Sequence, residues 1–366
     1  DVDLIRGSAV ICRDRKVRVA DEVGTTSVCQ GKNILVAAGA KANLADLPGM
    51  DLPGVMTSEE LLTADAHKYD RMLILGGGVI GLELATVFQS LGTEVTVVEI
   101  SDRLLPNMDR EFSDALERIL TGRGIRICKE SILERIEQEK ESGRLVCRFV
   151  CDGRNNKEVV DAVLVSVGRS PATEGLFESD VPVKLERGRI VVDDFFRTNI
   201  PGVYAVGDGT GGIQLAHVAS AQAVNAVCSM FGERAPMNLS CIPSCIYTNP
   251  EIAAVGMTAD EAKMRGIRTI TGMAIMSSNG KTVIEMVDRG FVKLVFEEES
   301  KVLLGAVLMC SRATDMITGL SDGVAGKLTM SQLAATVRPH PTFSEAIGEA
   351  IEDADGGAIH AAPRRK

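Results

Sequence analysis

The sequence predicts an α/β protein with a separate α+β domain at its C-terminal end, and two observations carry this prediction. Between residues 72 and 99, an apolar strand, a glycine-rich turn, a helix and a second strand follow one another, which is the start of a βαβ unit. From residue 236 onward the pattern changes to strands followed by long helices. With 366 residues, the chain is long enough for two or three cores.

Composition and charge narrow the function classes. Hydrophobic residues make up 45% and charged residues 25% of the chain, and no apolar run approaches the roughly 18 residues of a membrane-spanning helix. The formal net charge of −10 argues against a nucleic-acid partner. Nine irregularly spaced cysteines fit reduced thiols better than a disulfide framework. We therefore expect a cytoplasmic protein with no membrane partner.

The first 70 residues are predicted to form a meander and a linker. Apolar and polar positions alternate on both sides of residues 21–26, and the apolar strand 34–37 that follows should be buried on both faces. Residues 41–70 hold two Pro-Gly turns, at 48–49 and 53–54, and are interpreted as a linker. The alternation that is typical of strands is already present near the start of the chain, so we expect the chain to begin inside a domain.

The rest of the chain alternates between strands and helices. The α/β region is predicted to extend to about residue 165, with a charged, β-rich excursion over 132–160. A short buried strand, 203–206, then ends at Gly207 and Asp208, and a helix over 218–231 follows. The C-terminal domain is predicted to contain three strands and two long helices, at 242–247, 292–296, 302–309, 312–326 and 343–354.

The glycine-rich turn has the pattern and the context of a dinucleotide site. The strand 73–75 enters a G-x-G-x-x-G pattern at 76–81, and a helix over 82–91 follows. One glycine makes the tight turn, the next lets a pyrophosphate approach the backbone, and the third lets the helix pack closely on the strand. Amides beginning at Gly76 and the positive end of the helix dipole would hold the phosphates. The NAD-binding residues predicted in this turn are Gly76, Gly78, Val79, Ile80 and Gly81.

Glu99 ends the second strand, about 20 residues after the turn, where such sites carry an acid. Its carboxylate would accept hydrogen bonds from the adenosine ribose hydroxyls and repel a 2′-phosphate, which favours NAD over NADP. Arg103 nearby could tolerate a 2′-phosphate, so NADP remains an alternative to NAD. The alternative is a turn that serves packing alone, with Glu99 as a solvated strand end. We predict a Rossmann-like NAD-binding domain over 46–165.

Several segments of the chain, taken in their order, resemble the class I pyridine nucleotide-disulfide oxidoreductase family. They are Ala-Ala-Gly-Ala at 37–40, the turn with Leu-Glu-Leu-Ala at 76–85, Ser-Val-Gly-Arg-Ser-Pro at 166–171, the segment ending in Gly-Asp at 198–208, and His-Pro-Thr-Phe-Ser-Glu-Ala at 340–346. Together with Leu-Ala-His at 215–217, the last segment is similar to the dihydrolipoamide dehydrogenase branch of the family rather than to glutathione or mercuric reductases.

The resemblance implies two cofactors, FAD and NAD. It places Asp208 on the ribityl chain of FAD, and an acid at the end of a buried strand is suited to accept hydroxyl hydrogen bonds. The alternative is that Asp208 is only a turn residue. Ala216 and His217 would offer main-chain contacts near the flavin ring. The implied FAD-binding residues are Gly39, Asp208, Leu215, Ala216 and His217.

Two further residues join the implied NAD site. Gly168 lies in the segment 166–171. Glu83 resembles the acid that lies near the nicotinamide and the flavin, where it meets a lysine of a segment that this chain lacks. Without that lysine, Glu83 is equally well interpreted as an unpaired acid on a helix face.

His340 and Glu345 are the candidate catalytic residues. Pro341 forces an extended or turn conformation on His340, and a histidine is suited to take a proton from a dithiol and return it in the same cycle. The resemblance makes His340 this base and Glu345 the carboxylate that orients its ring. The alternative for His340 is a surface or hydrogen-bonded turn histidine. Because Thr342-x-x-Glu345 is a capping-box pattern, the alternative for Glu345 is a glutamate that only caps a helix.

Two features of the family are absent from these 366 residues. No two cysteines are separated by four residues, and no N-terminal G-x-G-x-x-G for the FAD pyrophosphate precedes the one at 76–81. The pairs Cys147–Cys151 and Cys241–Cys245 fall in predicted strands, where their spacing puts both side chains on one face, and are interpreted as packed thiols. No metal site is predicted, since no histidine lies close to either pair. We expect a chain that is truncated at its N-terminus.

The sequence therefore predicts four ranges and one main function. They are a remnant of an FAD domain (1–45), an NAD domain (46–165), the second half of the FAD domain (166–236) and an α+β dimerisation domain (237–366). The complete protein is expected to be a homodimer that oxidises dihydrolipoamide on the lipoyl domain of a 2-oxoacid dehydrogenase complex or a glycine cleavage system. The alternatives are another disulfide reductase of the family and a non-catalytic NAD-binding module.

Overall fold

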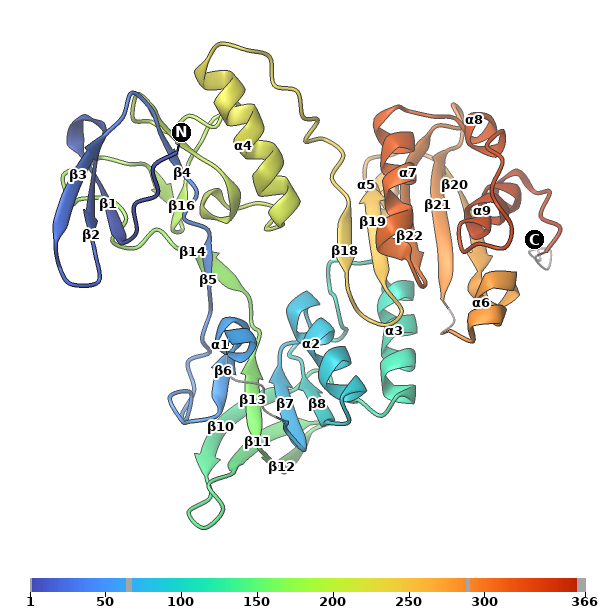
Figure 1. Cartoon of the computed structure of the whole chain (residues 1–366). Helices are drawn as coiled ribbons and strands as arrows, with labels where there is room; N and C mark the ends of the chain where they lie inside the picture. The colour runs from blue at the N-terminus through green and yellow to red at the C-terminus, as the bar shows by residue number, and fades with distance from the viewer. Residues whose placement is uncertain (1, 64–67, 288–289, 361–366) are drawn as a thin grey trace. The chain divides into compact units, whose positions relative to one another are not determined.

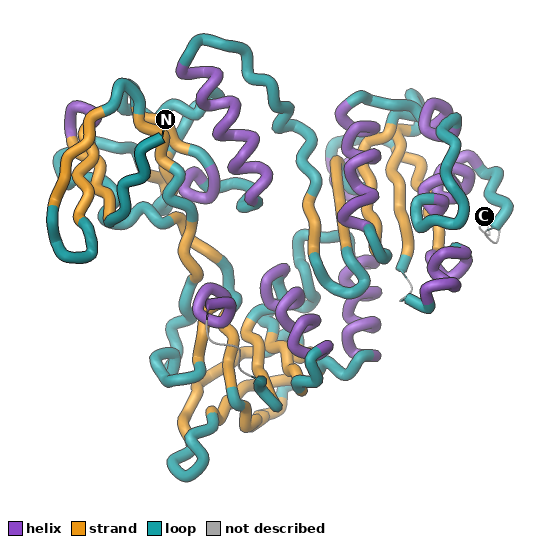
Figure 2. Tube along the Cα trace, viewed as in Figure 1, coloured by secondary structure: helices purple, strands orange, loops and turns teal. Residues whose placement is uncertain are grey.

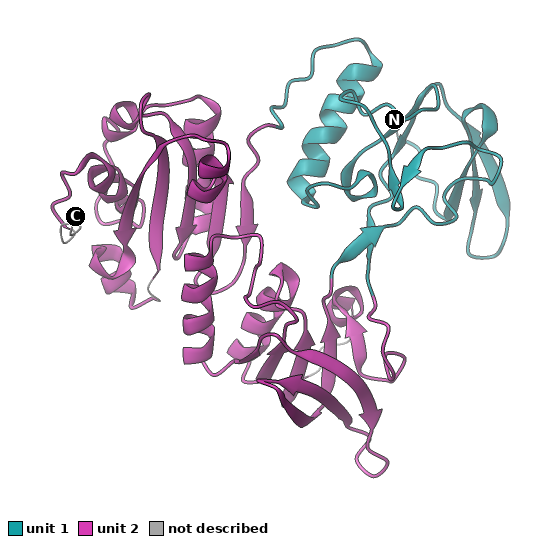
Figure 3. Ribbon diagram, turned by 180° about the vertical axis from the view of Figure 1, so that it is seen from behind, with its two compact units in different colours: residues 1–43, 168–239 teal, residues 44–167, 240–366 magenta. Residues whose placement is uncertain are grey.

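A computed structural model of the chain describes residues 2–63, 68–287 and 290–360. They form two compact units, which Figure 3 colours separately. Unit 1 consists of residues 1–43 and 168–239, and unit 2 consists of residues 44–167 and 240–366. Each unit is therefore assembled from two segments that are distant in sequence.

An antiparallel meander opens unit 1, as the alternating pattern predicts. The strands β1 (Ser8–Cys12), β2 (Lys16–Ala20) and β3 (Thr26–Gln30) pair in that order, and a short 3₁₀ turn, η1 (Arg13–Arg15), joins the first two. Asp21 shapes the turn before β3 because one of its carboxylate oxygens accepts the amide hydrogens of Val23 and Thr25.

A parallel strand pair forms the centre of unit 1. In β4 (Ile34–Val36), which pairs with β17 (Val203–Ala205), only Val36 is buried. The expectation that this strand is buried on both faces is wrong, because in the described chain no further strand pairs with the outer edge of β4. The other elements of unit 1 are β5 (Ala40–Ala42), β14 (Arg169–Pro171), β15 (Leu185–Glu186), β16 (Arg189–Ile190), η2 (Gly207–Thr210) and α4 (Ala216–Met230).

Unit 2 begins with a five-stranded parallel sheet in the order β6-β13-β7-β8-β9. Met72, Leu73 and Ile74 of β7 are fully buried, as expected for an inner strand of such a sheet. The elements are β6 (Val55–Thr57), α1 (Ser58–Thr63), β7 (Arg71–Leu75), α2 (Val79–Ser90), β8 (Glu94–Val98), α3 (Arg110–Gly122), β9 (Arg126–Cys128) and β13 (Ala162–Val165).

The interpretation of residues 41–70 as a linker is wrong. This segment contains β6, which pairs with β13 in the parallel sheet, and α1 follows it directly. Gly49, in the first Pro-Gly turn, lies so close to the chain that a β-carbon on it would be 2.1 Å from the Ile136 oxygen. The turns thus hold the segment against the domain instead of separating two domains.

The charged excursion over 132–160 is a three-stranded antiparallel meander. It consists of β10 (Ile132–Gln138), β11 (Leu145–Cys151) and β12 (Arg154–Val160). Alternate residues of β11, which include Phe149, Cys147 and Cys151, belong to one buried cluster. A spacing of four residues in a strand therefore puts both thiols on the buried face, as predicted.

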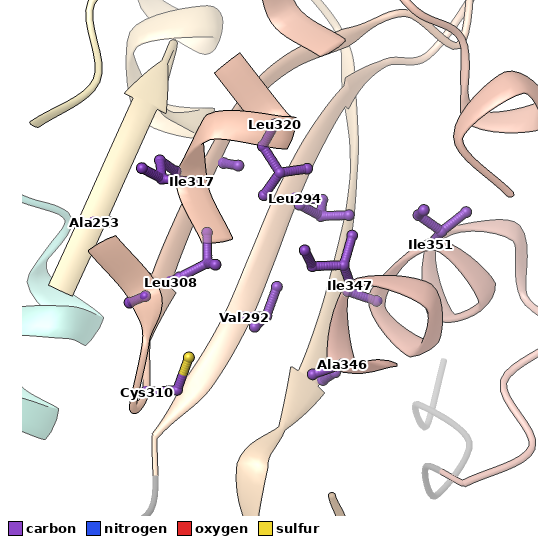
Figure 4. Close-up of a cluster of buried hydrophobic side chains, with 14 of the residues drawn as sticks. Ala253, Val292, Leu294, Leu308, Cys310, Ile317, Leu320, Ala346, Ile347 and Ile351 are labelled. Carbon is purple, nitrogen blue, oxygen red and sulfur yellow. The ribbon is translucent and has the colours of Figure 1, made fainter. Parts of the chain in front are cut away.

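The C-terminal part of unit 2 is an antiparallel sheet in the order β18-β19-β22-β21-β20. Figures 1 and 2 show helix α7 lying along this sheet, and Figure 4 shows Val292, Leu294 and Leu308 of the sheet meeting Ile317 and Ile347 of the helices. The elements are β18 (Ser244–Ile246), β19 (Ile252–Gly256), α5 (Ala259–Met264), β20 (Thr269–Ile275), η3 (Met276–Ser278), α6 (Gly280–Glu285), β21 (Phe291–Glu297), β22 (Leu303–Met309), α7 (Ala313–Ala325), α8 (Met330–Ala334) and α9 (Glu345–Asp355).

The opposite face of the antiparallel sheet shares a core with the parallel-sheet half of unit 2. The rings of Phe112 in α3 and Phe291 in β21 have centroids 4.3 Å apart. Lys293 of β21 forms a mostly buried ion pair with Asp109 at 3.1 Å and also contacts Glu111. The sheet residues that join the buried cluster of α2 and α3 are Ile246, Ile252, Val307 and Met309.

Candidate functional site

The predicted dinucleotide turn joins β7 to α2 and has the geometry that phosphate binding requires. Gly76 adopts a φ of +110°, which other residues rarely adopt, and α2 begins at Val79. A β-carbon on Gly81 would lie 2.1 Å from the Gly76 oxygen, so only glycine allows this helix to pack so closely. A β-carbon on Gly78 would meet nothing within 4 Å, which leaves a ligand space to approach the backbone.

The sequence predicted free amides from Gly76 onward, but in the structure the free amides begin at Gly78. Gly76 donates its N–H to the Val98 oxygen at 2.9 Å. Gly77 donates its N–H to the Glu99 carboxylate at 2.6 Å. Within the described chain, no acceptor bonds the amides at the start of α2, which are those of Gly78, Val79, Ile80 and Gly81. These amides lie at the positive end of the helix dipole, where a phosphate is stabilised.

Glu99 is buried, with 7% of its surface exposed, so the alternative of a solvated strand end is wrong. Its second carboxylate oxygen accepts the Ser101 amide hydrogen at 2.7 Å. Each oxygen still has lone-pair capacity for a ribose hydroxyl. Arg103, the residue that left NADP as an alternative, donates from its guanidinium to the Pro106 oxygen at 2.6 Å.

Glu83 is half-buried on α2, and the alternative of an unpaired acid is wrong. Its Oε1 atom accepts the amide hydrogen of Tyr247, just after β18, at 2.8 Å. Burial raises the pKa of the Glu83 carboxyl, and the Tyr247 amide opposes that rise. Glu83 therefore connects the helix of the dinucleotide turn with the C-terminal sheet of the same unit.

The predicted FAD residues lie around the turn that follows β17. Gly207 has a φ of +70° and donates its amide hydrogen to the Gln222 side chain of α4 at 2.7 Å. Asp208 is half-buried, and none of the described residues donates a hydrogen bond to its carboxylate. A β-carbon on Gly209 would lie 3.6 Å from the Gly39 oxygen, so Gly39 lies beside the same turn. An acceptor without a protein donor, beside two glycines, fits a polyhydroxy ligand.

The remaining predicted cofactor residues all belong to unit 1. Leu215 is the N-cap of α4, and Ala216 and His217 form its exposed first turn, in unit 1 with Asp208. Gly168 also belongs to unit 1, has a φ of +110° and accepts the Asn43 amide hydrogen at 2.9 Å. The other predicted NAD residues all belong to unit 2.

His340 and Glu345 meet at the start of α9. The Nδ1 atom of His340 lies 2.8 Å from Oε1 of Glu345, and the two side chains are 77% and 26% exposed, respectively. The half-buried guanidinium of Arg338 donates to the oxygens of Thr336 and Leu333 at 3.1 and 3.2 Å and so holds the preceding segment. A titratable ring at the surface, with a carboxylate on one nitrogen, is suited to general acid–base chemistry.

Glu345 also contacts the backbone before the helix. Its Oε2 atom accepts the Thr342 amide hydrogen at 2.8 Å. The Thr342 hydroxyl bonds Pro339 and Ser344 and not the Glu345 amide, so only half of the capping box forms. The Thr342 amide, and then the His340 ring, lower the pKa of the Glu345 carboxyl. One carboxylate thus contacts the imidazole ring and also accepts a backbone amide hydrogen just before α9.

The cysteines are all unpaired. Burial raises the pKa of Cys147 and Cys310 to about 12, which makes both thiols poor nucleophiles. Cys245 lies in β18, but the prediction that Cys241 shares that strand is wrong, because β18 begins at Ser244. Among the residues that the structure describes, no cluster could hold a metal ion and no helix is long and apolar enough to cross a bilayer.

Sequence reasoning missed the residues that hold the candidate site residues in place. Gln222, Tyr247 and Asn279 each make one of the contacts that orient a loop or a carboxylate of the candidate site. The Tyr247 contact joins residues 164 positions apart, and the Asn279 contact to Thr342 joins residues 63 positions apart. Only the folded chain brings such partners together, and no local pattern identifies them.

Comparison with known proteins gives two family matches. The model described as pyridine nucleotide-disulphide oxidoreductase matches residues 2–223, and its dimerisation domain matches residues 242–351. A dihydrolipoyl dehydrogenase of Bacillus subtilis is 36% identical over 332 residues, which are 90% of this chain and 69% of the relative. One from Zymomonas mobilis is 33% identical over 98% of this chain and 77% of its own length.

Solved structures agree with these matches. The Cu(II) complex of the HOCl-induced flavoprotein disulfide reductase RclA from Escherichia coli superposes with a TM-score of 0.88 at 27% identity, over 96% of this chain and 78% of that one. LpdA from Mycobacterium tuberculosis superposes with a TM-score of 0.83 at 29% identity, over 92% and 72%.

These matches confirm the fold class that the sequence predicts, with FAD- and NAD-binding domains and a dimerisation domain. They also confirm FAD and NAD as the cofactors, because oxidoreductases of the dihydrolipoyl dehydrogenase type use both. The chain belongs to the pyridine nucleotide-disulphide oxidoreductase family.

Proposed function

We propose that this chain is the nucleotide-binding and dimerising part of a dihydrolipoamide dehydrogenase, which oxidises dihydrolipoamide on a lipoyl domain and uses NAD as the acceptor. The observation that carries the proposal is the 2.8 Å contact between Nδ1 of the exposed His340 and Oε1 of Glu345. The curated relatives, named dihydrolipoyl dehydrogenases, support the substrate class. We place the protein in the cytoplasm because unpaired thiols fit a reducing compartment.

His340 is proposed to move the proton of the reaction. With Nδ1 on Glu345, the ring has Nε2 for exchange, so Nε2 takes the proton as the S–H bond of the dihydrolipoyl group breaks. The resulting imidazolium is stabilised by the Glu345 carboxylate. The thiolate then attacks a disulfide and displaces its other sulfur as a thiolate. That disulfide would come from residues outside these 366, which contain no suitable cysteine pair.

The cofactors would be held by residues of both units. FAD supplies the electron-transfer chemistry that no side chain has. We propose that residues 1–45 and 166–236 bind it, with Asp208 on its hydroxyls. Residues 46–165 would bind NAD, with its phosphates on the free amides from Gly78 to Gly81 and its adenosine ribose on Glu99.

The matched dimerisation domain supports a homodimer. Apolar side chains are exposed on α6, at its C-terminal end and in the segment before His340. Asn279, directly before α6, bonds the loop over 335–344 that carries His340, here called the acid–base loop. Exposed apolar side chains of this kind are typical of a surface that a second subunit covers. The apolar side chains are Val283, Ile284, Met286 and Val337. A lipoyl domain of a 2-oxoacid dehydrogenase complex or of a glycine cleavage system is the proposed physiological partner.

Flavin absorbance and lipoamide-dependent turnover test this function. The 366-residue chain should show neither, and a version extended upstream by its natural coding sequence should show both. In the extended version, His340→Gln should lower kcat by about 10²- to 10⁴-fold. The control Gly122→Ala, at an open position of α3, should leave kcat unchanged. Turnover of other disulfides but not of lipoamide would overturn the substrate proposal.

A second candidate is a reductase of the family that acts on a different disulfide. The structural similarity to the flavoprotein disulfide reductase RclA favours this alternative. A panel of disulfide substrates with the extended version separates the two candidates. If an upstream sequence does not exist and no flavin binds, the chain acts as a non-catalytic NAD-binding module instead.

A further inference from the structure

A buried side chain outside the predicted site anchors the acid–base loop. Asn279 lies between η3 and α6 and is 2% exposed. Its Nδ2 atom donates to the Thr342 oxygen at 3.0 Å. Its Oδ1 atom accepts the Thr282 amide hydrogen at 3.0 Å and the Thr282 hydroxyl hydrogen at 3.2 Å. One side chain thus joins the start of α6 to the loop that carries His340.

A chain of hydrogen bonds leads from Asn279 through Thr342 and Glu345 to the imidazole. Thr342 accepts from Asn279 with its carbonyl and donates its N–H to Oε2 of Glu345 at 2.8 Å. Glu345 uses its other oxygen on Nδ1 of His340, also at 2.8 Å. The carbonyl and the N–H of Thr342 lie in neighbouring peptide planes that share its Cα atom, so anchoring the carbonyl limits the positions that the N–H can take.

We propose that Asn279 is a positioning residue for the His340–Glu345 pair, because it fixes the backbone of Thr342 and, through it, the carboxylate that orients the imidazole. The inference deepens the proposed function and rests on it, since the pair must exchange a proton with a thiol for this orientation to matter. A buried amide whose partner is lost remains an unsatisfied polar group, so the contact resists opening.

The chemistry of asparagine suits this position. Its side chain offers a donor and an acceptor at the same time, and here each is used on a different segment. Serine would keep the acceptor for α6 but is too short to reach the loop. Ionised aspartate would keep the acceptor and lose the donor. Each variant therefore separates the contact with the loop from the cap of α6.

Several charged groups on α9, α6 and the neighbouring segments must stay constant in a test of this role. Glu345, Glu349 and Glu352 lie on successive turns of α9; His360 interacts electrostatically with Glu345 and Glu349, and Arg338 with Glu352. On α6, Lys281 and Glu285 pair with each other at 2.8 Å. A substitution of Asn279 by serine alters none of them, so a changed titration of His340 would report a changed geometry.

The test is a titration of the His340 ring in the whole chain with ¹⁵N-labelled histidine, over about pH 5 to 9. The chain has four histidines, and His340→Asn identifies the signal of interest. Glu345→Gln sets the reference, since it removes the charge from the ring partner. Asn279→Ser should lower the midpoint of His340 by at least half of the Glu345→Gln shift. The matched control Thr282→Val, which removes only a contact of α6, should leave the midpoint unchanged.

A folded Asn279→Ser variant with the wild-type midpoint and ring tautomer would overturn the proposal. If this variant does not fold, Asn279→Asp is used, since it keeps the shape of the side chain and the α6 cap. For this variant the tautomer of the His340 ring is measured, because the added charge alone shifts the midpoint of the His340 titration. A loss of the Nδ1-protonated form supports the proposal, and its retention contradicts it. The titration uses no substrate or flavin, so its outcome is independent of whether lipoamide is turned over.

Discussion

Glu99 in the dinucleotide turn and Glu345 in the acid–base loop each close a short loop with a carboxylate, but they use their two oxygens differently. Glu99 is buried and accepts backbone amide hydrogens with both oxygens, from Gly77 and Ser101. Glu345 is more exposed and places one oxygen on the Thr342 amide and the other on the His340 ring. The first carboxylate is held by groups that do not titrate, whereas the second shares its contact with one that does.

The difference separates a carboxylate that fixes backbone geometry from one whose contact depends on a proton. A carboxylate on two amides fixes the course of the glycine turn at every pH at which it is ionised. A carboxylate on one amide and one imidazole has the same anchoring, but its second contact changes with the protonation of the ring. We therefore expect substitutions in the dinucleotide turn to act mainly on stability and ligand affinity, and those in the acid–base loop to act mainly on proton transfer.

The largest effect is expected in the dinucleotide turn for Gly81→Ala. The new β-carbon would collide with the Gly76 oxygen, so the free energy of unfolding should fall by about 3 kcal/mol and NAD binding should be lost. Gly78→Ala, at an open position, should lose NAD binding without a change in stability. Gly122→Ala in α3 should keep NAD binding and stabilise by about 0.5–1 kcal/mol. Urea unfolding and calorimetric titration with NAD measure both quantities, and equal stability of all three variants would contradict the packing argument.

Glu99→Gln tests the carboxylate that is held by two amides. The glutamine amide group would face a backbone N–H where the carboxylate oxygen accepted one, so the variant should lose about 2 kcal/mol of stability. It should also bind NADP better relative to NAD, because the charge that repels a 2′-phosphate is gone. The ratio of the two dissociation constants is the measurement. An unchanged ratio would remove Glu99 from nucleotide selection.

Glu345→Gln should cost less stability, about 1 kcal/mol, because the glutamine oxygen can still accept the Thr342 amide hydrogen. The contacts of Glu345 lower the pKa of its carboxyl in the folded chain, so this stabilisation is fully present above the unfolded pKa of about 4.3. It is lost as the pH falls through the lower folded pKa. The difference between wild type and variant, measured by urea unfolding across this range, should shrink on acidification. A difference that grows on acidification would reverse the assigned sign.

Thr342→Val should have the smallest effect. Its hydroxyl contacts Pro339 and Ser344, and their loss should cost about 0.5–1 kcal/mol. The bond to Glu345 uses the backbone N–H of residue 342, which valine retains, so the titration of His340 should not change. A shifted His340 midpoint in this variant would show that the hydroxyl, and not the backbone, orients the pair.

Much of the fold could be predicted because its periodic segments are long and buried. The helix predicted over 312–326 is observed as α7 (Ala313–Ala325), and the strand predicted over 302–309 is observed as β22 (Leu303–Met309). The short strand β6 was missed because three residues after two Pro-Gly turns are too few to show a period. Whether β4 is buried depends on which strands pair with its edges, and the composition of the strand does not specify that.

The candidate site was predictable where one segment carries both partners. His340 and Glu345 are five residues apart, and their contact follows from a motif on one loop. The free amides were predicted two residues too early, because the strand and Glu99 use the amides of Gly76 and Gly77. Asn279 and Tyr247 could not be found in this way, since each acts on a residue that only tertiary packing brings near.

The core that β21 and α3 share has a consequence for protein engineering. The ring contact between Phe112 and Phe291 and the ion pair between Lys293 and Asp109 leave no clean boundary at which the nucleotide-binding half of unit 2 could be excised. A recombinant fragment cut between residues 167 and 240 would expose a broad apolar face and aggregate. Chimeras that exchange cofactor specificity between relatives should therefore transfer the matching sheet together with the helix that rests on it.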